Sequence, residues 1–565
     1  MGMYALGLDY GTNSCRCLIL DLVDGSEIAS AVYAYPSGKD GILLDPQDPN
    51  VARQDPNDYI RGLSMVKTAI QKAKKARKGF DPKQIIGIGV DTTGSTPIPV
   101  DREGMPLSMQ PRFRRNLDAM AWLWKDHTSH AEAAEITELA RKTHPEYLAK
   151  CGGVYSSEWF WAKLLHCRRV APEVFKAAHS WVECCDFLPA LLTGETRPGK
   201  IARSVCAAGH KAMYCEEWGG LPEKKFLDAL DPALGALRGR LYRKAVPSNR
   251  AAGKLSTSWA RKLGLRPGIA VAVGAFDAHM GAVGAGIEEG ILVKILGTST
   301  CDMMVMPNHK QKLADIPGVC GIVNGSVLPD FYGIEAGQSA VGDIFLWFVN
   351  HLVPDRYGRT ADEKFKKLGE LAARQKPGEH GLLALDWNNG NRCLLVDPRL
   401  TGLLVGQTLH TSAPEIYRAL IEATAFGALA IIQRIQEYGV PVREIVNCGG
   451  LATKNPLLMQ IYADVTNRPM KVSASDQTCA LGAAIFGAAA AGQKVSSFAS
   501  VPDIQEVVSN LSDTVYQPDA ERHAVYAEMY RLYRELHDAF GTAAWSGRLH
   551  HVMKEMIALR ERQRM

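Results

Sequence analysis

The chain has 565 residues, of which 46% are hydrophobic and 22% charged, and its formal net charge is +5. This length exceeds what one hydrophobic core supports and predicts about two to four domains. The small net charge gives no case for a nucleic-acid partner, and the lack of an apolar run of about 18 residues predicts no membrane span.

The N-terminal half begins with a predicted hairpin, followed by a helix and a buried strand that ends on Asp91. The predicted bounds are 4–9 and 15–22 for the hairpin strands, 56–77 for the helix and 85–91 for the next strand. The stretch 105–260 is rich in Trp, His and charged residues. We interpret it as an irregular insertion that carries specificity elements.

The C-terminal half repeats this plan from about residue 265. A strand runs into Asp277, and a second strand–turn–strand hairpin follows. The later predicted elements are helices at 412–439, 455–467, 479–492 and beyond 518, and strands at 444–448 and 470–475. Ser412 with Glu415 is typical of a capping box, and Gly439 of a helix stop. Asn455 followed by Pro456 is typical of an N-cap and a first helical residue. The two halves therefore form a weak internal repeat of α/β units.

The 13 cysteines are odd in number and scattered, without a C-x-x-C pair. This pattern favours neither a zinc site nor a disulfide framework, and it predicts buried, reduced thiols. The N-terminus lacks a basic segment followed by an apolar stretch, so we expect no secretory signal and a cytoplasmic protein.

Two Gly-Thr turns are candidate phosphate-binding loops. No Gly-Lys pair is followed by Ser or Thr as a Walker loop requires, and no helix follows either turn as a dinucleotide fingerprint requires. A glycine hairpin can still present backbone N–H groups to a phosphate, while neighbouring side chains add donors. The donors of the first turn are Gly11, Thr12, Asn13, Ser14 and Arg16, and the second turn spans 297–300. A tight turn without a ligand stays the alternative for either loop alone.

Asp9 favours the phosphate interpretation. It lies just before the first turn, and a carboxylate beside phosphates is repelled unless a cation lies between them. The sequence therefore implies Mg²⁺, held by Asp9 directly or through water.

Several motifs spread over nearly the whole chain resemble the FGGY carbohydrate kinases. They are GLDYGTNSCR, VGAFDAH, GTST, EAGQSAVGD, DWNNGNR, EATAFG and CGGLATKN. The resemblance implies an α/β, two-domain actin-like or Hsp70-like ATPase fold (ribonuclease H-like) with a central cleft. It also implies that 1–264 form a mainly sugar-binding domain with the first hairpin. Residues 265–565 would form a mainly ATP-binding domain with the second hairpin and C-terminal helices.

The resemblance assigns roles to single positions. Asp277 matches the family's catalytic base and a sugar contact. The other matched sugar contacts are Gly94, Lys211 and Glu335. The matched nucleotide contacts are Thr298 beside Gly297, then Gly342, Gly450 and Asn455. At the position of Gly94 a family member carries alanine, so the fine sugar preference stays open.

Two further residues near these motifs keep more than one interpretation. Asp91 either caps the following turn or supports the sugar pocket. His279 is expected to be a hydrogen-bonded partner and not a base.

The implied activity is ATP-dependent phosphorylation of a 2-ketopentose, with L-ribulose at its 5-hydroxyl, in arabinose catabolism, as the expected substrate. A related kinase of D-ribulose, xylulose or a polyol is the first alternative. A non-catalytic actin-like ATP-binding module is the second, and Asp277 argues against it. The expected ligands are ATP, Mg²⁺ and the sugar, and a homodimer is an open expectation.

Overall fold

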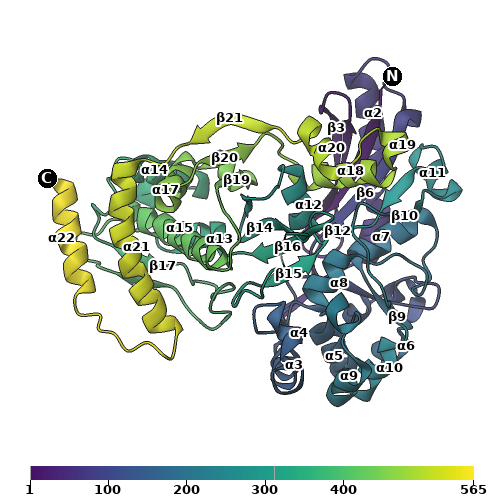
Figure 1. The fold of residues 1–565 in the computed structure, drawn as a ribbon, viewed down its shortest axis with the longest axis horizontal. Helices are drawn as coiled ribbons and strands as arrows, with labels where there is room; N and C mark the ends of the chain where they lie inside the picture. The colour runs from purple at the N-terminus through teal and green to yellow at the C-terminus, as the bar shows by residue number, and fades with distance from the viewer. Residues whose placement is uncertain (1, 311) are drawn as a thin grey trace.

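A computed structural model describes residues 2–310 and 312–565, and it contains two seven-stranded sheets, one in each half of the chain (Figure 1). The first sheet contains β1 (Tyr4–Tyr10), β2 (Ser14–Asp21), β3 (Glu27–Ala34), β6 (Ile85–Thr92), β10 (Ala251–Lys254), β11 (Ala270–Ala272) and β12 (Ala275–Phe276). The second contains β13 (Ile291–Leu296), β14 (Thr300–Pro307), β15 (Gly321–Asn324), β16 (Phe331–Ala336), β19 (Glu444–Cys448), β20 (Met470–Ser473) and β21 (Leu511–Tyr516).

The two sheets share one local plan. In each, a hairpin of antiparallel strands comes first, β1–β2 or β13–β14, and its first strand pairs in parallel with a later strand, β6 or β19. Both predicted hairpins and the predicted internal repeat are confirmed. The parallel pairing places both hairpin turns at the carboxyl ends of the central strands.

The stretch 105–260 is inserted within the first sheet, after β6, and is mostly helical, so the prediction that it is irregular is wrong. The helix predicted at 56–77 is also interrupted and forms two. The helices of this half are α1 (Pro56–Gly62), α2 (Met65–Ala76), α3 (His130–Thr143), α4 (Pro145–Ala149), α5 (Phe160–Val170), α6 (Pro172–Ala177), α7 (Cys184–Thr193), α8 (Val205–Lys211), α9 (Lys224–Leu230), α10 (Pro232–Arg238) and α11 (Thr257–Leu263). Short strands accompany them: β4 (Leu43–Asp45), β5 (Asp48–Gln54), β7 (Pro97–Val100), β8 (Ala121–Trp122) and β9 (Ser180–Glu183).

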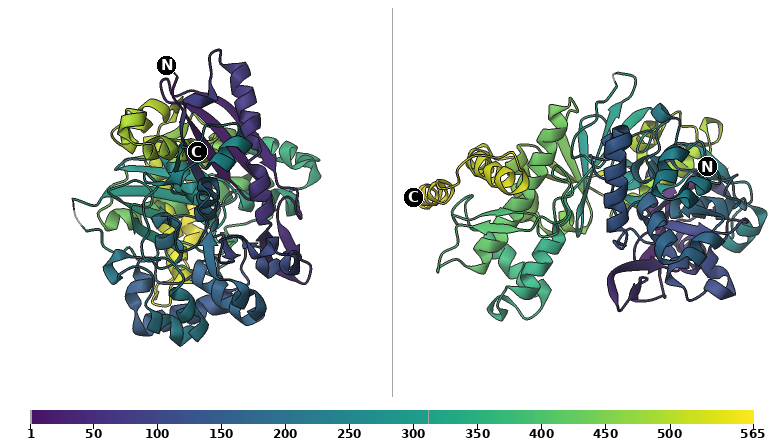
Figure 2. Two further views of the ribbon diagram at one scale, coloured as in Figure 1. Left: turned by 90° about the vertical axis from the view of Figure 1, so that its right-hand side faces the viewer. Right: turned by 90° about the horizontal axis from the view of Figure 1, so that it is seen from below.

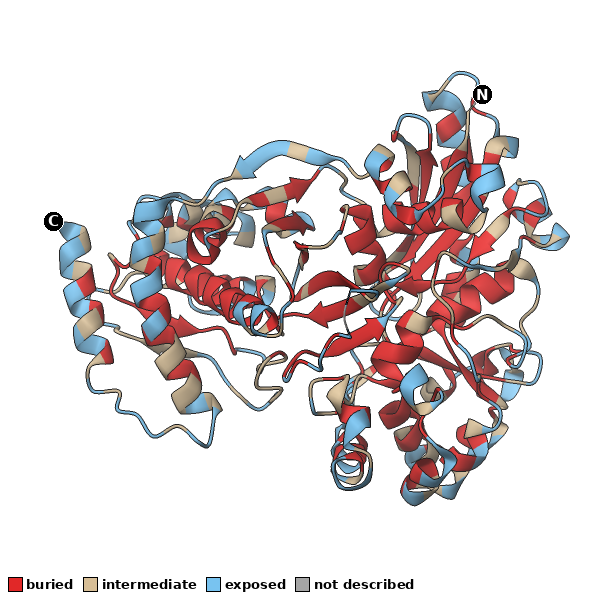
Figure 3. Ribbon diagram, viewed as in Figure 1, coloured by how far each residue is buried: buried red, intermediate tan, exposed pale blue. Residues whose placement is uncertain are grey.

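The C-terminal half is organised around one long buried helix, α15 (Ala413–Glu437), which Figure 3 shows in red. Its capping box of Ser412 and Glu415 is confirmed, and Gly439 follows its end with a φ of 83°. The other elements are α12 (Asp277–Gly284), α13 (Gly342–His351), α14 (Ala361–Ala372), α16 (Gly450–Lys454), α17 (Pro456–Thr466), α18 (Thr478–Ala490), α19 (Gln493–Ser496), α20 (Val501–Val508), α21 (Ala520–Gly541), α22 (Val552–Arg564), β17 (Leu383–Leu385) and β18 (Leu403–Val405).

The helix α18 comes late in the chain but packs against the first sheet and α12 (Figures 1 and 2). Glycines make this approach possible, because a Cβ on Gly7 or Gly89 would collide with the α18 backbone. The small residues of α18 therefore allow it to pack tightly against the sheet. The division of the chain after residue 264 stays a prediction, and β11 and β12, which follow it, pair within the first sheet.

The burial of the cysteines agrees with the prediction from their scattered pattern. All 13 cysteines are free, and most are buried. Within residues 2–310 and 312–565, no helix is both long enough and apolar enough to cross a membrane.

Candidate active site

Three aspartates meet at the carboxyl ends of β1 and β6. The register of these parallel strands places Asp9 beside Asp91. On the other side of β6, Ala275 of β12 lies opposite Asp91, and Asp277 follows as the first residue of α12. Asp9 and Asp91 are buried, whereas Asp277 is partly exposed. The predicted base, Asp277, and the predicted metal ligand, Asp9, thus lie together at the carboxyl ends of these strands.

Their mutual repulsion and burial change how these carboxyls ionise. Burial, followed by the charges of Asp9 and Asp277, raises the pKa of Asp91 well above its usual range. Burial, followed by the charge of Asp9, raises the pKa of Asp277 to about 7. The backbone N–H of Ala278 donates to Asp277 Oδ1 at 2.7 Å. Asp277 is therefore held in place and can take up a proton near neutral pH.

Asp91 does not cap the following turn. Neither of its carboxylate oxygens has a hydrogen-bond partner in the described part of the chain, and its side chain is fully buried. Asp9, in contrast, accepts from Arg16, whose Nη1 lies 3.1 Å from Asp9 Oδ2. Burial raises the pKa of Asp9, and the Arg16 charge opposes that shift.

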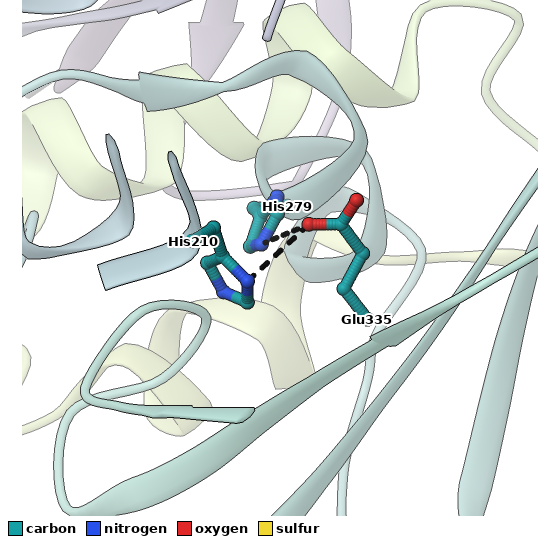
Figure 4. Close-up of side chains that lie close together, drawn as sticks. All are labelled: His210, His279 and Glu335. Carbon is teal, nitrogen blue, oxygen red and sulfur yellow. Dashed lines mark ion pairs between the residues drawn. The ribbon is translucent and has the colours of Figure 1, made fainter. Parts of the chain in front are cut away.

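An ion pair between Lys211 and Glu335 joins the two halves of the chain. Lys211 ends α8, and its Nζ lies 3.1 Å from Oε1 of Glu335 on β16. Arg392 Nη2 lies 2.9 Å from the same oxygen. Two histidines face the other carboxylate oxygen, with His210 Nδ1 at 3.3 Å and His279 Nε2 at 3.8 Å (Figure 4). Burial alone would raise the pKa of Glu335, but Lys211 and these neighbours hold it below its usual range.

Gly94 lies on the loop after β6, close to the ring of Phe276. A Cβ at position 94 would lie 3.7 Å from Phe276 Cγ, which is an ordinary contact distance. Alanine would therefore fit here without moving the loop. Lys211 Nζ lies 5.8 Å from the centre of the same ring. The four predicted sugar contacts, Gly94, Lys211, Asp277 and Glu335, thus cluster around Phe276, although they come from distant parts of the sequence.

The side chains of the first hairpin turn are partly held by the protein itself. Thr12 Oγ1 accepts from Trp124 Nε1 at 3.1 Å, and Asn13 Nδ2 donates to the backbone oxygen of Asp40 at 2.6 Å. Arg16 is occupied by Asp9, as described above. The N–H of Gly11 also donates within the turn, to the Ser14 carbonyl at 3.0 Å. The N–H groups of Thr12 and Asn13 and the hydroxyl of Ser14 are therefore the donors left to test.

The second hairpin turn gathers three of the predicted nucleotide contacts. Gly297 and Thr298 are exposed. The N–H groups of Val341 and Gly342 donate to the carbonyls of Thr298 and Gly297, at 2.8 and 3.1 Å. A Cβ on Gly342 would lie 2.6 Å from the Gly297 oxygen, so this contact requires glycine. The start of α13 is thereby attached to the turn.

The remaining predicted nucleotide contacts begin two short helices. Gly450 starts α16 and is exposed, and no described atom lies near the space that its Cβ would take. Asn455 is the N-cap of α17, as predicted, because its side chain accepts from the N–H of Leu458 at 3.1 Å. Its amide also donates to the Tyr417 hydroxyl at 3.3 Å.

Two partners of Glu335 were not predicted from the sequence. Arg392 lies in DWNNGNR and His210 precedes Lys211, so both stand within or next to recognised motifs, but no spacing links either to residue 335. The prediction that His279 is hydrogen-bonded is wrong: neither of its ring nitrogens has a hydrogen-bond partner among the residues that the structure describes.

Comparison with known proteins places this site in a family. Residues 4–284 match the N-terminal domain and residues 292–491 the C-terminal domain of the "FGGY family of carbohydrate kinases". The chain therefore belongs to the FGGY family of carbohydrate kinases, and the predicted family and enzyme class are confirmed.

Two relatives match this chain over nearly their full length. The chain is 42% identical to "Ribulokinase" of Vibrio parahaemolyticus, covering 94% of this chain and 95% of that protein. It is also 42% identical to "Ribulokinase" of Halalkalibacterium halodurans, covering 99% and 98%. The crystal structure of ligand-bound xylulose kinase from Lactobacillus acidophilus has a TM-score of 0.76 at 20% identity, covering 96% and 99%. This likeness confirms the predicted actin-like fold of two α/β domains.

Proposed function

We propose that this chain transfers the γ-phosphoryl group of ATP to the 5-hydroxyl of L-ribulose, in the cytoplasm, as a step of arabinose catabolism. The observation that carries the proposal is the position of Asp277, a carboxyl that titrates near neutral pH beside the cluster of predicted sugar contacts. The two ribulokinases that are 42% identical over nearly the full length support ribulose as the sugar, and its L-configuration is part of the proposal.

Asp277 acts as the general base in this proposal. It accepts the proton of the 5-hydroxyl while that oxygen forms a bond to the γ-phosphorus, and the bond from phosphorus to the leaving oxygen of ADP breaks in line. Lys211 and Glu335 hold the sugar hydroxyls, and Gly94 leaves room for the sugar beside Phe276. Most of the rate acceleration then comes from positioning and charge stabilisation.

The carboxyl group cluster fits Mg²⁺. This ion prefers oxygen ligands and binds through one or two carboxylates together with substrate phosphates. Asp91 has two unpartnered buried oxygens, and Asp9 lies beside it in register. Asp9 would hold the ion, and Asp91, which lies beside it in register, would support it. The bound ion would neutralise charge on the phosphates.

The two hairpins hold the phosphates of ATP from opposite sides of a cleft. The first contributes the turn 11–14 with Arg16, and the second contributes Gly297 and Thr298, supported by Gly342. Gly450 and Asn455 bind the remainder of the nucleotide, and the division after residue 264 separates a mainly sugar-binding from a mainly ATP-binding domain. A homodimer stays a prediction.

A substrate panel tests the proposal. ADP release is measured with Mg·ATP and L-ribulose, D-ribulose, D-xylulose or glycerol, against a control without sugar. L-ribulose is expected to give the highest kcat/KM. If a different sugar is preferred, the proposed substrate is wrong, but the assignment as a sugar kinase stands. ADP release that no sugar stimulates would instead favour an actin-like ATP-binding module that phosphorylates no sugar.

A further inference from the structure

His279 is a buried residue that the proposed chemistry leaves without a role. It is the third residue of α12, two positions after Asp277, and its side chain is only 2% exposed. Neither ring nitrogen has a hydrogen-bond partner within the described ranges. A buried polar group without a partner destabilises the folded protein, so a ligand that satisfies it is one explanation for its presence.

The surroundings of His279 are the predicted sugar contacts. Its Nε2 lies 3.8 Å from Glu335 Oε2, which is too long for a hydrogen bond (Figure 4). Its ring centre lies 5.9 Å from that of Phe276, the ring beside Gly94. His279 therefore stands between the base, the Glu335 ion pair and the loop of Gly94.

The neighbouring His210 is used differently. Its Nε2 is hydrogen-bonded to Ser326 Oγ at 3.0 Å, and its Nδ1 faces Glu335. The two imidazole rings meet edge to face, with centres 4.5 Å apart. His210 is thus anchored at Nε2, whereas its Nδ1 has no hydrogen-bond partner among the described residues. The two rings touch, but His210 satisfies neither nitrogen of His279.

A metal ion is a poor occupant of this cluster. The ligand atoms of His210, His279 and Glu335 lie within 4.8 Å of one another, as a divalent metal site would require. The carboxylate of Glu335 is, however, already paired with two cations, Lys211 at 3.1 Å and Arg392 at 2.9 Å. A further divalent cation would be repelled by both.

An uncharged polyhydroxy compound fits better. Lysine and arginine only donate hydrogen bonds and an ionised carboxylate only accepts them, whereas a neutral imidazole does one at each nitrogen. Burial lowers the pKa of His279 to about 4, so the ring is neutral at physiological pH. A hydroxyl group can donate to one ring nitrogen, and a second oxygen of the same sugar can accept from the other.

We propose that His279 is a specificity-determining residue of the sugar site, its two ring nitrogens binding neighbouring oxygens of the ketopentose. This inference rests on the proposed function, because the ligand is the proposed substrate. Removal of the ring nitrogens then weakens sugar binding but not folding, since these nitrogens have no hydrogen bond to lose among the residues that the structure describes.

The test compares His279→Phe, which keeps a ring, with His279→Asn and His279→Gln, whose amides lie near Nδ1 and Nε2 respectively. His537→Phe is the matched control, because His537 is also buried with an unpartnered Nε2 but lies on α21 in the C-terminal half. For His279→Phe we expect the KM for L-ribulose to rise about tenfold or more, and the KM for ATP to change less than about twofold. His537→Phe should change neither.

Three further measurements separate a sugar contact from a structural role. The melting temperature of sugar-free His279→Phe should equal or exceed that of the unmutated protein, and its stabilisation by L-ribulose should be lost. Partial recovery of KM in either amide variant would identify the nitrogen that matters. With deoxy-pentuloses, the unmutated enzyme should discriminate against loss of one hydroxyl, and His279→Phe should not.

An unchanged KM for L-ribulose in His279→Phe would overturn the inference, as would a lowered melting temperature with sugar stabilisation intact. Tight binding of Zn²⁺ by the unmutated protein but not by His279→Phe, measured by calorimetry, would also overturn it in favour of a metal site. If the unmutated protein phosphorylates no ketopentose, the proposed function fails first, and this outcome is visible in the control arm.

Discussion

The position of Asp277 makes the pH dependence of the reaction a sharp test of its role as base. A general base acts in its deprotonated form, so kcat/KM for the sugar should rise as pH increases through the pKa of the free enzyme. Burial and the nearby charge of Asp9 raise that pKa to about 7. An aspartate with the ordinary pKa of 3.8 would be fully ionised over the same range and would give a flat profile.

The magnitude follows from the titration. With a pKa of about 7, roughly one tenth of the enzyme carries ionised Asp277 at about pH 6 and roughly nine tenths at about pH 8, so kcat/KM should rise about tenfold. The assay should detect ADP directly, because coupling enzymes have pH profiles of their own. Asp277→Asn should lower kcat by about 10²–10⁴-fold and remove the pH dependence of what remains.

The raised pKa of Asp277 also changes how the stability of the protein depends on pH, which gives a second measurement. The pKa of Asp277 is higher in the folded than in the unfolded protein. At pH values between these two pKa values, the folded protein therefore binds more protons. As a result, the contribution of Asp277 lowers the free energy of unfolding as the pH rises from about 4 to 7. Asp277→Asn should therefore melt at an equal or higher temperature than the unmutated protein at about pH 8. A flat kcat/KM profile, or near-normal kcat in Asp277→Asn, would refute the assignment.

Three further substitutions test the other parts of the site. Asp9→Ala should raise the KM for Mg·ATP and alter the Mg²⁺ dependence, while calorimetric sugar binding stays normal; unchanged ATP and Mg²⁺ dependences would exclude Asp9 as the metal ligand. Gly342→Ala would place a Cβ 2.6 Å from a backbone oxygen of the second hairpin, so the KM for ATP should rise. The control Gly369→Ala, in open space on α14, should stabilise the protein by roughly 0.5–1 kcal/mol without changing kinetics. Lys211→Met should cost about 3–5 kcal/mol of unfolding free energy by leaving a buried carboxylate underpaired, and denaturant unfolding should show a smaller loss when Glu335→Gln is added.

Elements with strong local signals could be predicted from the sequence. Both hairpins, the capping box of Ser412 and the N-cap of Asn455 depend on residues only a few positions apart, and each was confirmed. The short helices between β7 and β10 were missed for a physical reason. Their core is built from aromatic residues such as Trp122, Trp161 and Trp181, which are buried at irregular spacing and obscure a helical period.

The candidate site could be predicted only in part, because contacts between residues far apart in the sequence produce no recognisable local pattern. The family resemblance supplied Lys211 and Glu335 separately, but nothing in the spacing indicates that they form an ion pair across 124 positions. Arg392 joins this pair from a third segment. The unpartnered state of His279 was equally invisible, since a pattern of letters does not show which polar groups lack a partner after folding.

The arrangement of charges explains why this site needs both halves of the chain. Asp9, Asp91 and Asp277 all lie at one end of the first sheet, and burial, followed by their mutual repulsion, raises the pKa of the latter two. Glu335 comes from the second sheet and stays ionised because Lys211, from the first half, lies beside it. Two kinds of carboxyl group therefore result within one site. One kind can exchange a proton near neutral pH, as the proposed general base must, and the other keeps a fixed negative charge.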